Sequence, residues 1–286
     1  MIWCPYTDRE IPIEETTPEH IISLALGGHN RLTLPVHGAT NSKLGAEIDG
    51  ALANEFHVAR QRAKLDARGH SGREPTQRFT KVKDRTTGKP LQINWGKRLE
   101  VYDPIAQQPV NGPVDFELTT HIDMTIRMRF LAKCFLSAGY RVYGDLFRRA
   151  VRHEEPRLLM NRKAQDLTEA ELASVRTRLF TWYNTDHADA AQAEEFEVQK
   201  QICSAIKGSL LVFMTGPENL AFFGGVLGQY LGMMNVPADT TDFPRTENYD
   251  MGFAIIVANG KLMTGSYRTL IRRLVESMPP EVRPAI

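Results

Sequence analysis

The sequence predicts an α+β fold, in which strands and helices occupy separate stretches of the chain. Three observations support this. Two short apolar runs near the amino end flank a glycine turn, the middle of the chain has helical spacing of apolar residues, and the last 80 residues or so return to strand-like runs. Strands and helices that are segregated in this way are typical of α+β proteins. With 286 residues, the chain is long enough for one large or two smaller domains.

The amino-terminal segment predicts a β-hairpin followed by a helix. Residues 17–24 form the first expected strand, residues 27–30 (Gly-Gly-His-Asn) the turn, and residues 32–36 the second strand. An apolar side chain then recurs every four residues, at Leu44, Ile48, Leu52 and Phe56. This spacing predicts a helix with one apolar stripe, and Thr40 or Asn41 is the expected cap at its start.

The middle of the chain combines a short β region with several helices. Residues from 58 continue with basic helical character and end in a loop at 68–75, and residues 76–117 have the alternation of strands. Four further helices are expected over residues 123–138, 143–151, 168–182 and 187–205. Thr120 or Asp123 is expected to cap the first of these and Gly139 to end it, while Thr168 and Glu171 have the spacing of a capping box.

The last part of the chain predicts an antiparallel sheet and a final helix. The strand-like runs cover residues 209–214, 220–223, 230–236, 252–257 and 261–263. Asn259-Gly260 lies between the last two, and this dipeptide is a strong signal for a tight hairpin turn. We expect a helix over residues 266–277, and we expect this domain to serve as a scaffold, a dimerisation surface or a partner-binding surface.

The charge of the chain is unevenly distributed. The net charge is +1, but residues 57–99 contain twelve Lys and Arg residues against three carboxylates, which gives that segment +9 and leaves −8 for the remainder. A basic segment of this kind favours a polyanionic partner. Its ordinary alternative is a solvated surface without a ligand.

Other features of the composition place the chain among ordinary globular proteins. Three widely spaced cysteines give no disulfide framework. The longest apolar run, residues 220–236, is interrupted by glycines and is shorter than the ~20 residues that cross a bilayer. The amino end has no pattern of a secretion signal. We therefore expect a cytoplasmic protein without a membrane partner.

The residues of the hairpin and helix predict a phosphodiesterase site. Glu19 and His20 lie together at the end of an extended segment, and Asn41 follows 21 residues after His20 at the start of the predicted helix. Histidine suits a general base because its ordinary pKa of about 6.5 leaves much of it neutral at physiological pH. Carboxylate and amide oxygens are the donors that Mg²⁺ or Mn²⁺ prefers. Adjacent strand residues point to opposite faces, so the site requires the strand to end or bend there.

The segment of residues 17–45 resembles the HNH endonuclease family, whose fold is called ββα-metal or His-Me finger. The resemblance rests on Pro18-Glu-His-Ile-Ile22, on the Gly27-Gly28 turn and on Thr40-Asn-Ser-Lys-Leu-Gly45, and it covers about a fifth of the chain. It implies that His20 is the general base and that Glu19 and Asn41 are ligands of a catalytic Mg²⁺ or Mn²⁺. Asn30 is the nearest counterpart of the middle asparagine of the motif.

One departure from the family concerns its structural zinc. Many HNH domains have two Cys-x-x-Cys pairs, whereas this chain has Cys4 and His37 at the corresponding places. Four ligands are needed for a closed zinc site, so we predict no structural zinc.

The resulting prediction is a metal-dependent endonuclease that nicks DNA or cuts both strands. Its segments are an HNH module over 1–57, a basic connecting region over 58–117, and a helical then β domain over 118–286. The residues expected to contact the DNA backbone, without regard to sequence, are Lys43, Arg60, Arg62, Lys64, Arg68, Lys81 and Lys83. Proteins of the family that the chain resembles are often mobile-element or anti-phage defence nucleases. The alternatives are a non-catalytic nucleic-acid- or partner-binding module on the same fold, and an RNase. A homodimer or a partner protein bound through the last domain is also expected.

Overall fold

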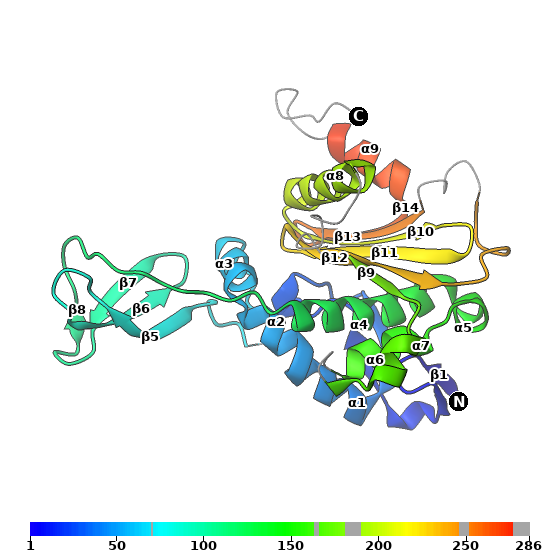
Figure 1. Cartoon of the computed structure of the whole chain (residues 1–286), viewed down its shortest axis with the longest axis horizontal. Helices are drawn as coiled ribbons and strands as arrows, with labels where there is room; N and C mark the ends of the chain where they lie inside the picture. Colours follow the sequence, from blue (N-terminus) through cyan, green and yellow to red (C-terminus); the bar gives the residue numbers. More distant parts are fainter. Residues whose placement is uncertain (70, 163–165, 181–189, 246–251, 277–286) are drawn as a thin grey trace.

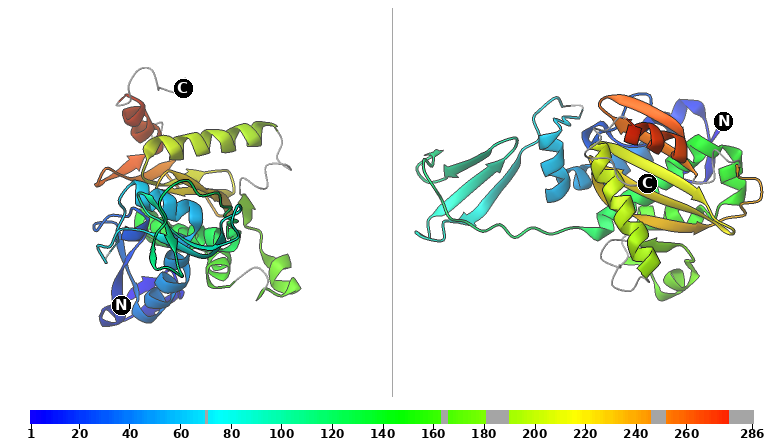
Figure 2. Two further views of the ribbon diagram at one scale, coloured as in Figure 1. Left: turned by 90° about the vertical axis from the view of Figure 1, so that its left-hand side faces the viewer. Right: turned by 90° about the horizontal axis from the view of Figure 1, so that it is seen from above.

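The computed structural model describes residues 1–69, 71–162, 166–180, 190–245 and 252–276 (Figure 1). The predicted α+β class is confirmed, since helices and antiparallel sheets are both present. A six-stranded sheet lies at the centre of the body, with helices on both of its faces, and a smaller four-stranded sheet projects from one end (Figures 1 and 2). Among the described residues, no helix has the length and apolar character that a membrane span requires.

The central sheet is formed by the last part of the chain, as predicted. Its strand order is β14-β13-β10-β11-β12-β9, with every neighbouring pair antiparallel. The strands are β9 (Arg178–Phe180), β10 (Ser209–Thr215), β11 (Asn219–Val226), β12 (Gln229–Pro237), β13 (Phe253–Ala258) and β14 (Lys261–Ser266). The turn at Asn259-Gly260 is confirmed, because both residues have positive φ and join β13 to β14 without an intervening gap.

Both faces of this sheet are apolar because each is covered by helices. Leu211 and Phe213 of β10 face α4 (Met124–Tyr143), whereas Leu210 and Val212, the alternate residues, face the opposite layer. That layer consists of α8 (Ala190–Ile206) and α9 (Tyr267–Glu276), which lie above the sheet in Figure 1. A continuous apolar run therefore forms strands of a covered sheet, which explains the long uncharged stretch at 220–236.

The amino-terminal segment packs against the other side of α4. Its elements are β1 (Ile2–Cys4), β2 (Arg9–Ile11), β3 (Thr16–His20), β4 (Thr33–His37), α1 (Gly38–Leu44), a π-helical stretch (Gly45–Asp49), α2 (Gly50–Asn54) and α3 (Phe56–Lys64), with short 3₁₀ turns at Ile13–Glu15 and Leu24–Leu26. One apolar cluster runs from this segment through α4 to the central sheet. The amino-terminal segment and the carboxy-terminal sheet thus share a core.

The remaining helices follow α4. They are α5 (Asp145–Ala150), α6 (Glu154–Asn161) and α7 (Glu169–Ser174). The predicted capping box is confirmed, since Thr168 and Glu171 exchange both hydrogen bonds at the start of α7. That helix ends at Ser174, whereas the predicted helix extends to residue 182. The prediction is wrong for residues 175–180, and Trp182 lies outside the described residues. The chain leaves the helix there because β9 joins the edge of the central sheet.

Other predicted boundaries also need correction. The first strand ends at His20 instead of residue 24, and neither Thr40 nor Asn41 caps α1, because His37 accepts the hydrogen bond from the Thr40 amide. Asp123 does cap α4 as predicted, but that helix passes Gly139 and ends at Tyr143, with Gly144 as its C-cap. Gly139 serves close packing instead, since a Cβ there would lie 2.2 Å from the Phe147 ring.

The projecting sheet is formed by the predicted β region of residues 76–117. Its strands are β5 (Gln77–Lys83), β6 (Pro90–Trp95), β7 (Leu99–Asp103) and β8 (Gln108–Pro109), joined in that order as antiparallel neighbours. Val82, Leu91 and Ile93 form its small core. We call this sheet the arm, and Figures 1 and 2 show that it extends away from the body beyond α3.

Candidate functional site

The predicted hairpin and helix form a ββα unit. β3 and β4 pair antiparallel, with Glu19 opposite Leu34 and His20 opposite Thr33, and α1 begins directly after β4. Asn41 on α1 donates from Nδ2 to Thr17 Oγ1 on β3 at 3.0 Å. This bond fixes the start of the helix across the hairpin. Thr17 and Glu19 are two residues apart on a strand, so Asn41 lies over the face that also carries Glu19.

The Gly27-Gly28 turn brings Asn30 against His20. Gly27 has φ of +76°, and a Cβ on Gly28 would lie 1.8 Å from the Ile22 carbonyl oxygen, so a side chain does not fit there. Asn30 follows in this loop, and its Oδ1 lies 3.3 Å from His20 Nε2. When Nε2 carries the ring proton it donates to Asn30, and the lone pair that a general base requires is then on Nδ1.

Glu19 faces the interior, where it belongs to a buried charge cluster. Its carboxylate Oε1 forms an ion pair with Lys133 of α4 and accepts a hydrogen bond of 3.3 Å from the Tyr6 hydroxyl. The Lys133 ammonium, which is fully buried, also contacts both carboxylate oxygens of Asp49, at 2.7 and 2.6 Å. We call Glu19, Lys133 and Asp49 the buried triad. It connects the ββα unit to the helix that covers the central sheet.

Burial and charge act in opposite directions within the triad. Burial raises the pKa of the Glu19 and Asp49 carboxyls, and the Lys133 ammonium opposes that rise in both cases. Burial lowers the pKa of Lys133, but the two carboxylates outweigh it and hold that pKa above its ordinary value. His20 also acts electrostatically on Asp49 and favours its ionised form. With Lys133 protonated and both carboxyls ionised, the triad has one net negative charge.

The donor atoms of the unit suit a hard divalent cation. Glu19 uses Oε1 for both of its described contacts, which leaves Oε2 as a donor, and Asn41 uses Nδ2 toward Thr17, which leaves its amide oxygen. Carboxylate and amide oxygens near an excess negative charge are the environment that Mg²⁺ or Mn²⁺ prefers. Lys133 limits this attraction, because it neutralises half of the carboxylate charge. In the described part of the chain, His, Cys, Asp and Glu form no group of three or more with the geometry of a metal site.

Cys4 and His37 contact each other at the start of α1. The His37 amide donates to Cys4 Sγ at 3.4 Å, and the His37 ring caps α1 through Nδ1. Cys4 is fully buried in the shared core. These two residues therefore connect β1 to the start of α1.

Two further ion pairs, one buried and one partly exposed, connect α4 to the amino-terminal segment. Arg127 donates from Nη2 to Glu55 at 2.7 Å, with both side chains buried, and Arg129 reaches Glu47 at 3.0 Å. Glu55 is in extended conformation and separates α2 from α3, which is why Phe56 does not continue the predicted apolar stripe. Phe56 instead packs against Phe79 and Trp95 of the arm.

Sequence reasoning missed these partners of the site, although a signal is present. Lys133 stands in the apolar run Phe130-Leu-Ala-Lys-Cys-Phe-Leu136 within a helix. A lysine in a helix that is apolar on all sides is buried, and a buried ammonium requires carboxylate partners. Asp49 has no comparable signal in its surroundings.

The predicted DNA-contacting residues fall into two groups. Arg60, Arg62 and Arg68 bond within the protein, with Arg60 donating to the Gly96 carbonyl at 2.8 Å while its guanidinium lies 4.1 Å from the centre of the Trp95 ring. Exposed lysines form the second group: Lys43 on α1, Lys64 on α3, and Lys81 and Lys83 on β5. Lys43 and Lys64 lie on the body, whereas Lys81 and Lys83 lie on the arm, so these lysines do not form one patch.

Comparison of the chain with protein-family models, with curated proteins and with solved structures finds no match. The candidate site is therefore interpreted from its own geometry.

Proposed function

We propose that the chain is a metal-dependent endonuclease that hydrolyses phosphodiester bonds of DNA at the ββα unit. The observation that carries the proposal is the contact between His20 Nε2 and Asn30 Oδ1, at 3.3 Å, at the end of a hairpin that is crossed by the Asn41-bearing helix. A histidine whose ring is held through one nitrogen is suited to take a proton through the other. The resemblance of residues 17–45 to HNH endonucleases agrees with this assignment.

Each residue of the unit has a defined part in the proposed reaction. His20 accepts a proton from the attacking water at Nδ1, and Asn30 keeps the ring in that orientation. Glu19 and Asn41 would hold the divalent ion through their oxygens, while Lys133 fixes the Glu19 carboxylate from the interior side. The bound ion would supply charge neutralisation at the departing oxygen of the phosphate.

Supercoiled plasmid and labelled RNA, incubated in parallel with the protein and Mg²⁺ or Mn²⁺, test this proposal. Conversion of the plasmid to nicked or linear DNA, abolished by EDTA and by His20→Ala, is the expected result. His57→Ala is the matched control, because His57 is exposed on α3 and belongs neither to the hairpin strands nor to α1. Cleavage of RNA alone would assign an RNase, and binding of DNA without cleavage under either ion would assign a non-catalytic module.

A further inference from the structure

The arm presents two chemically different faces. Phe79, Val82, Leu91, Ile93 and Val101 lie on one face and form its apolar core. Strand register places the alternate residues on the opposite face, where Arg78 is opposite Asn94 and Asn94 is opposite Glu100. That opposite face, which we call the polar face, consists of Arg78, Lys83, Gln92, Asn94, Glu100 and Tyr102.

Hydrogen bonds hold three side chains of the polar face in a row. Arg78 donates from Nη2 to Gln92 Oε1, and Gln92 donates in turn from Nε2 to Asn94 Oδ1 at 3.0 Å. Each side chain is thereby oriented while donor groups are left over, since a guanidinium has five N–H groups and an amide has two. Side chains that are ordered before binding lose less conformational entropy when they contact a ligand.

Charge is concentrated on the hairpin formed by β5 and β6. Between residues 77 and 95 the chain has five cationic residues, Arg78, Lys81, Lys83, Arg85 and Lys89, and one carboxylate, Asp84. Asp84 accepts hydrogen bonds from the Thr86 and Thr87 amides at 2.8 Å and stabilises the turn. The acidic residues of the arm's strands, Glu100 and Asp103, lie on β7 instead. The outer strand of the arm, β5, is thus on the basic side, and the chain next to its end bridges to Phe116 at Asp84.

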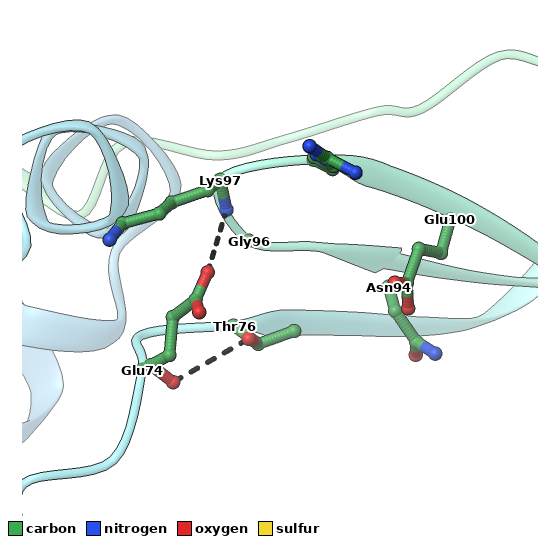
Figure 3. A pocket seen from close by; sticks show the side chains of 7 residues that line it. Glu74, Thr76, Asn94, Gly96, Lys97 and Glu100 are labelled. Carbon is green, nitrogen blue, oxygen red and sulfur yellow. Dashed lines mark hydrogen bonds between the residues drawn. The ribbon is translucent and has the colours of Figure 1, made fainter.

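The root of the polar face is hollowed. A hollow of about 320 Å³ is lined by residues that include Thr76, Asn94 and Glu100. Figure 3 shows Asn94 and Glu100 side by side on neighbouring strands, with Glu74 and Lys97 nearer to the body. Hydrogen-bond donors and acceptors therefore occur together on a concave surface next to the basic hairpin.

We propose that the β5–β6 hairpin enters the major groove of double-stranded DNA and that Arg78 and Asn94 read base edges there. The inference takes its substrate, DNA, from the proposed function. It adds recognition of the base sequence to the contacts with the DNA backbone that the sequence predicted. Neighbouring strands lie about 4.8 Å apart, so the outer pair β5–β6 is narrower than the major groove, which is about 12 Å wide. β7 pairs with the other edge of β6, so in this pose it would lie at the rim of the groove. Arginine and asparagine have the bidentate geometry for guanine and adenine edges, respectively.

Lysines beside the polar face would contact the DNA backbone. Lys81 lies at the bulge between Phe79 and Val82 on the edge strand, and both Lys81 and Lys83 are exposed. Contacts of this kind fix the register of a protein on a duplex without reading its sequence. Duplex RNA is a poorer occupant, because the major groove of A-form helices is too narrow for a strand ribbon to reach the bases.

A binding selection from random DNA duplexes tests the inference without any need for cleavage. The full chain is used with His20→Ala, so that bound duplexes stay intact, and enriched sequences are compared with those selected when Arg78→Ala or Asn94→Ala is added. We expect an enriched motif, and we expect each added substitution to weaken the preference at its own base pair by about 10- to 100-fold. Arg272→Ala on α9 is the matched control, since it removes the same charge from an exposed site on the body, and Figure 1 shows α9 above the central sheet, away from the arm.

Several outcomes would overturn the inference. These are the absence of any enriched motif, the same motif at the same strength in the Arg78→Ala and Asn94→Ala proteins, or stronger binding of duplex RNA than of DNA. Neither residue belongs to the arm's core, so both variants should fold, and thermal unfolding checks that they do. A motif that depends on the arm would stand even if the protein never nicks DNA. If the protein nicks DNA but selects no motif, only the proposal that the arm reads base edges is rejected.

Discussion

Substitution of Lys133 by Met tests the buried triad. The ammonium is fully buried and contacts Glu19 and both oxygens of Asp49, so its removal leaves two carboxyls in the interior without their cation. Met has similar length and packs well in apolar surroundings, so the change removes charge and leaves little empty volume. The ββα unit should lose this ionic connection to α4, while its apolar contacts with that helix remain.

The magnitude follows from the contact distances. At an effective dielectric constant of about 20, two charges 2.7 Å apart attract by ~6 kcal/mol, so the two carboxylates together give a gross attraction of ~12 kcal/mol. Desolvation of three ions and repulsion between the carboxylates offset most of this. Breaking a buried pair on one side has a net effect of ~3–5 kcal/mol, and we expect Lys133→Met to lower the free energy of unfolding by about that amount.

Urea unfolding at pH 7.5 and pH 5 measures the effect. Without Lys133, the pKa values of Glu19 and Asp49 rise further, so the folded variant binds more protons than its unfolded chain as the pH falls. Its stability relative to wild type should therefore increase from pH 7.5 to pH 5, since protonated carboxyls are no longer buried charges. Lys43→Met is the matched control, because the Lys43 side chain is 67% exposed, and it should change stability by less than ~0.5 kcal/mol.

A rescue keeps the experiment informative if Lys133→Met does not fold. Adding Glu19→Gln and Asp49→Asn removes both unpaired charges, and the triple variant should return to within ~1–2 kcal/mol of wild type. The reasoning would be refuted if Lys133→Met unfolded within ~1 kcal/mol of wild type at pH 7.5, or if its deficit did not change with pH.

Three further predictions concern the turn, the base and the arm. Gly28→Ala should lower the free energy of unfolding by more than ~2 kcal/mol, because the added Cβ meets the Ile22 carbonyl. Gly45→Ala is the control and should not lower it, because Gly45 has a helical backbone conformation and open space around it. Equal thermal unfolding temperatures for the two variants would contradict this. Asn30→Ala should slow plasmid nicking about 10- to 100-fold at unchanged stability, and an unaltered rate would remove Asn30 from the site. Arg60→Ala should weaken the attachment of the arm to the body by ~1–2 kcal/mol, and protease cleavage between residues 65 and 76 should become faster. Lys64→Ala, at an exposed lysine, is the control. The same cleavage rate in both variants would show that Arg60 does not hold the arm.

Local signals in the sequence were sufficient for most elements. The Asn-Gly dipeptide predicted the β13–β14 turn, alternation predicted the arm, and glycines between two apolar runs predicted the β3–β4 hairpin. In each case the determining contacts lie within about 20 residues along the chain. Boundaries that depend on distant contacts were wrong. Gly139 did not end α4, because the space beside it is filled by Phe147, a residue whose packing the pattern does not reveal.

The site was predictable only in part, for the same physical reason. His20 contacts Asn30 within one hairpin, and Asn41 donates to Thr17 of the same hairpin, so these contacts are local. The partners of Glu19 are not local, since Lys133 lies 114 residues further along the chain. The sequence pattern places the Glu19 carboxylate next to His20 in the chain. Only the fold shows that α4 supplies a cation, the Lys133 ammonium, as its partner.

The arginines of the basic segment illustrate a similar limit. Their positive charge predicted contact with DNA, but Arg62 donates to the Ala53 carbonyl and Arg68 pairs with Asp66. Composition reports the charge of a segment and leaves open which side chains serve packing.

The rate of plasmid nicking by wild-type protein and by His20→Ala, measured in single turnover with saturating Mg²⁺, tests the central claim most directly. The ββα unit as a nuclease site predicts a rate about 10²- to 10⁴-fold lower for His20→Ala, with unchanged affinity for DNA, because only the proton acceptor is lost. Equal rates for the two proteins, or no cleavage by wild type with Mg²⁺ or Mn²⁺, would contradict it.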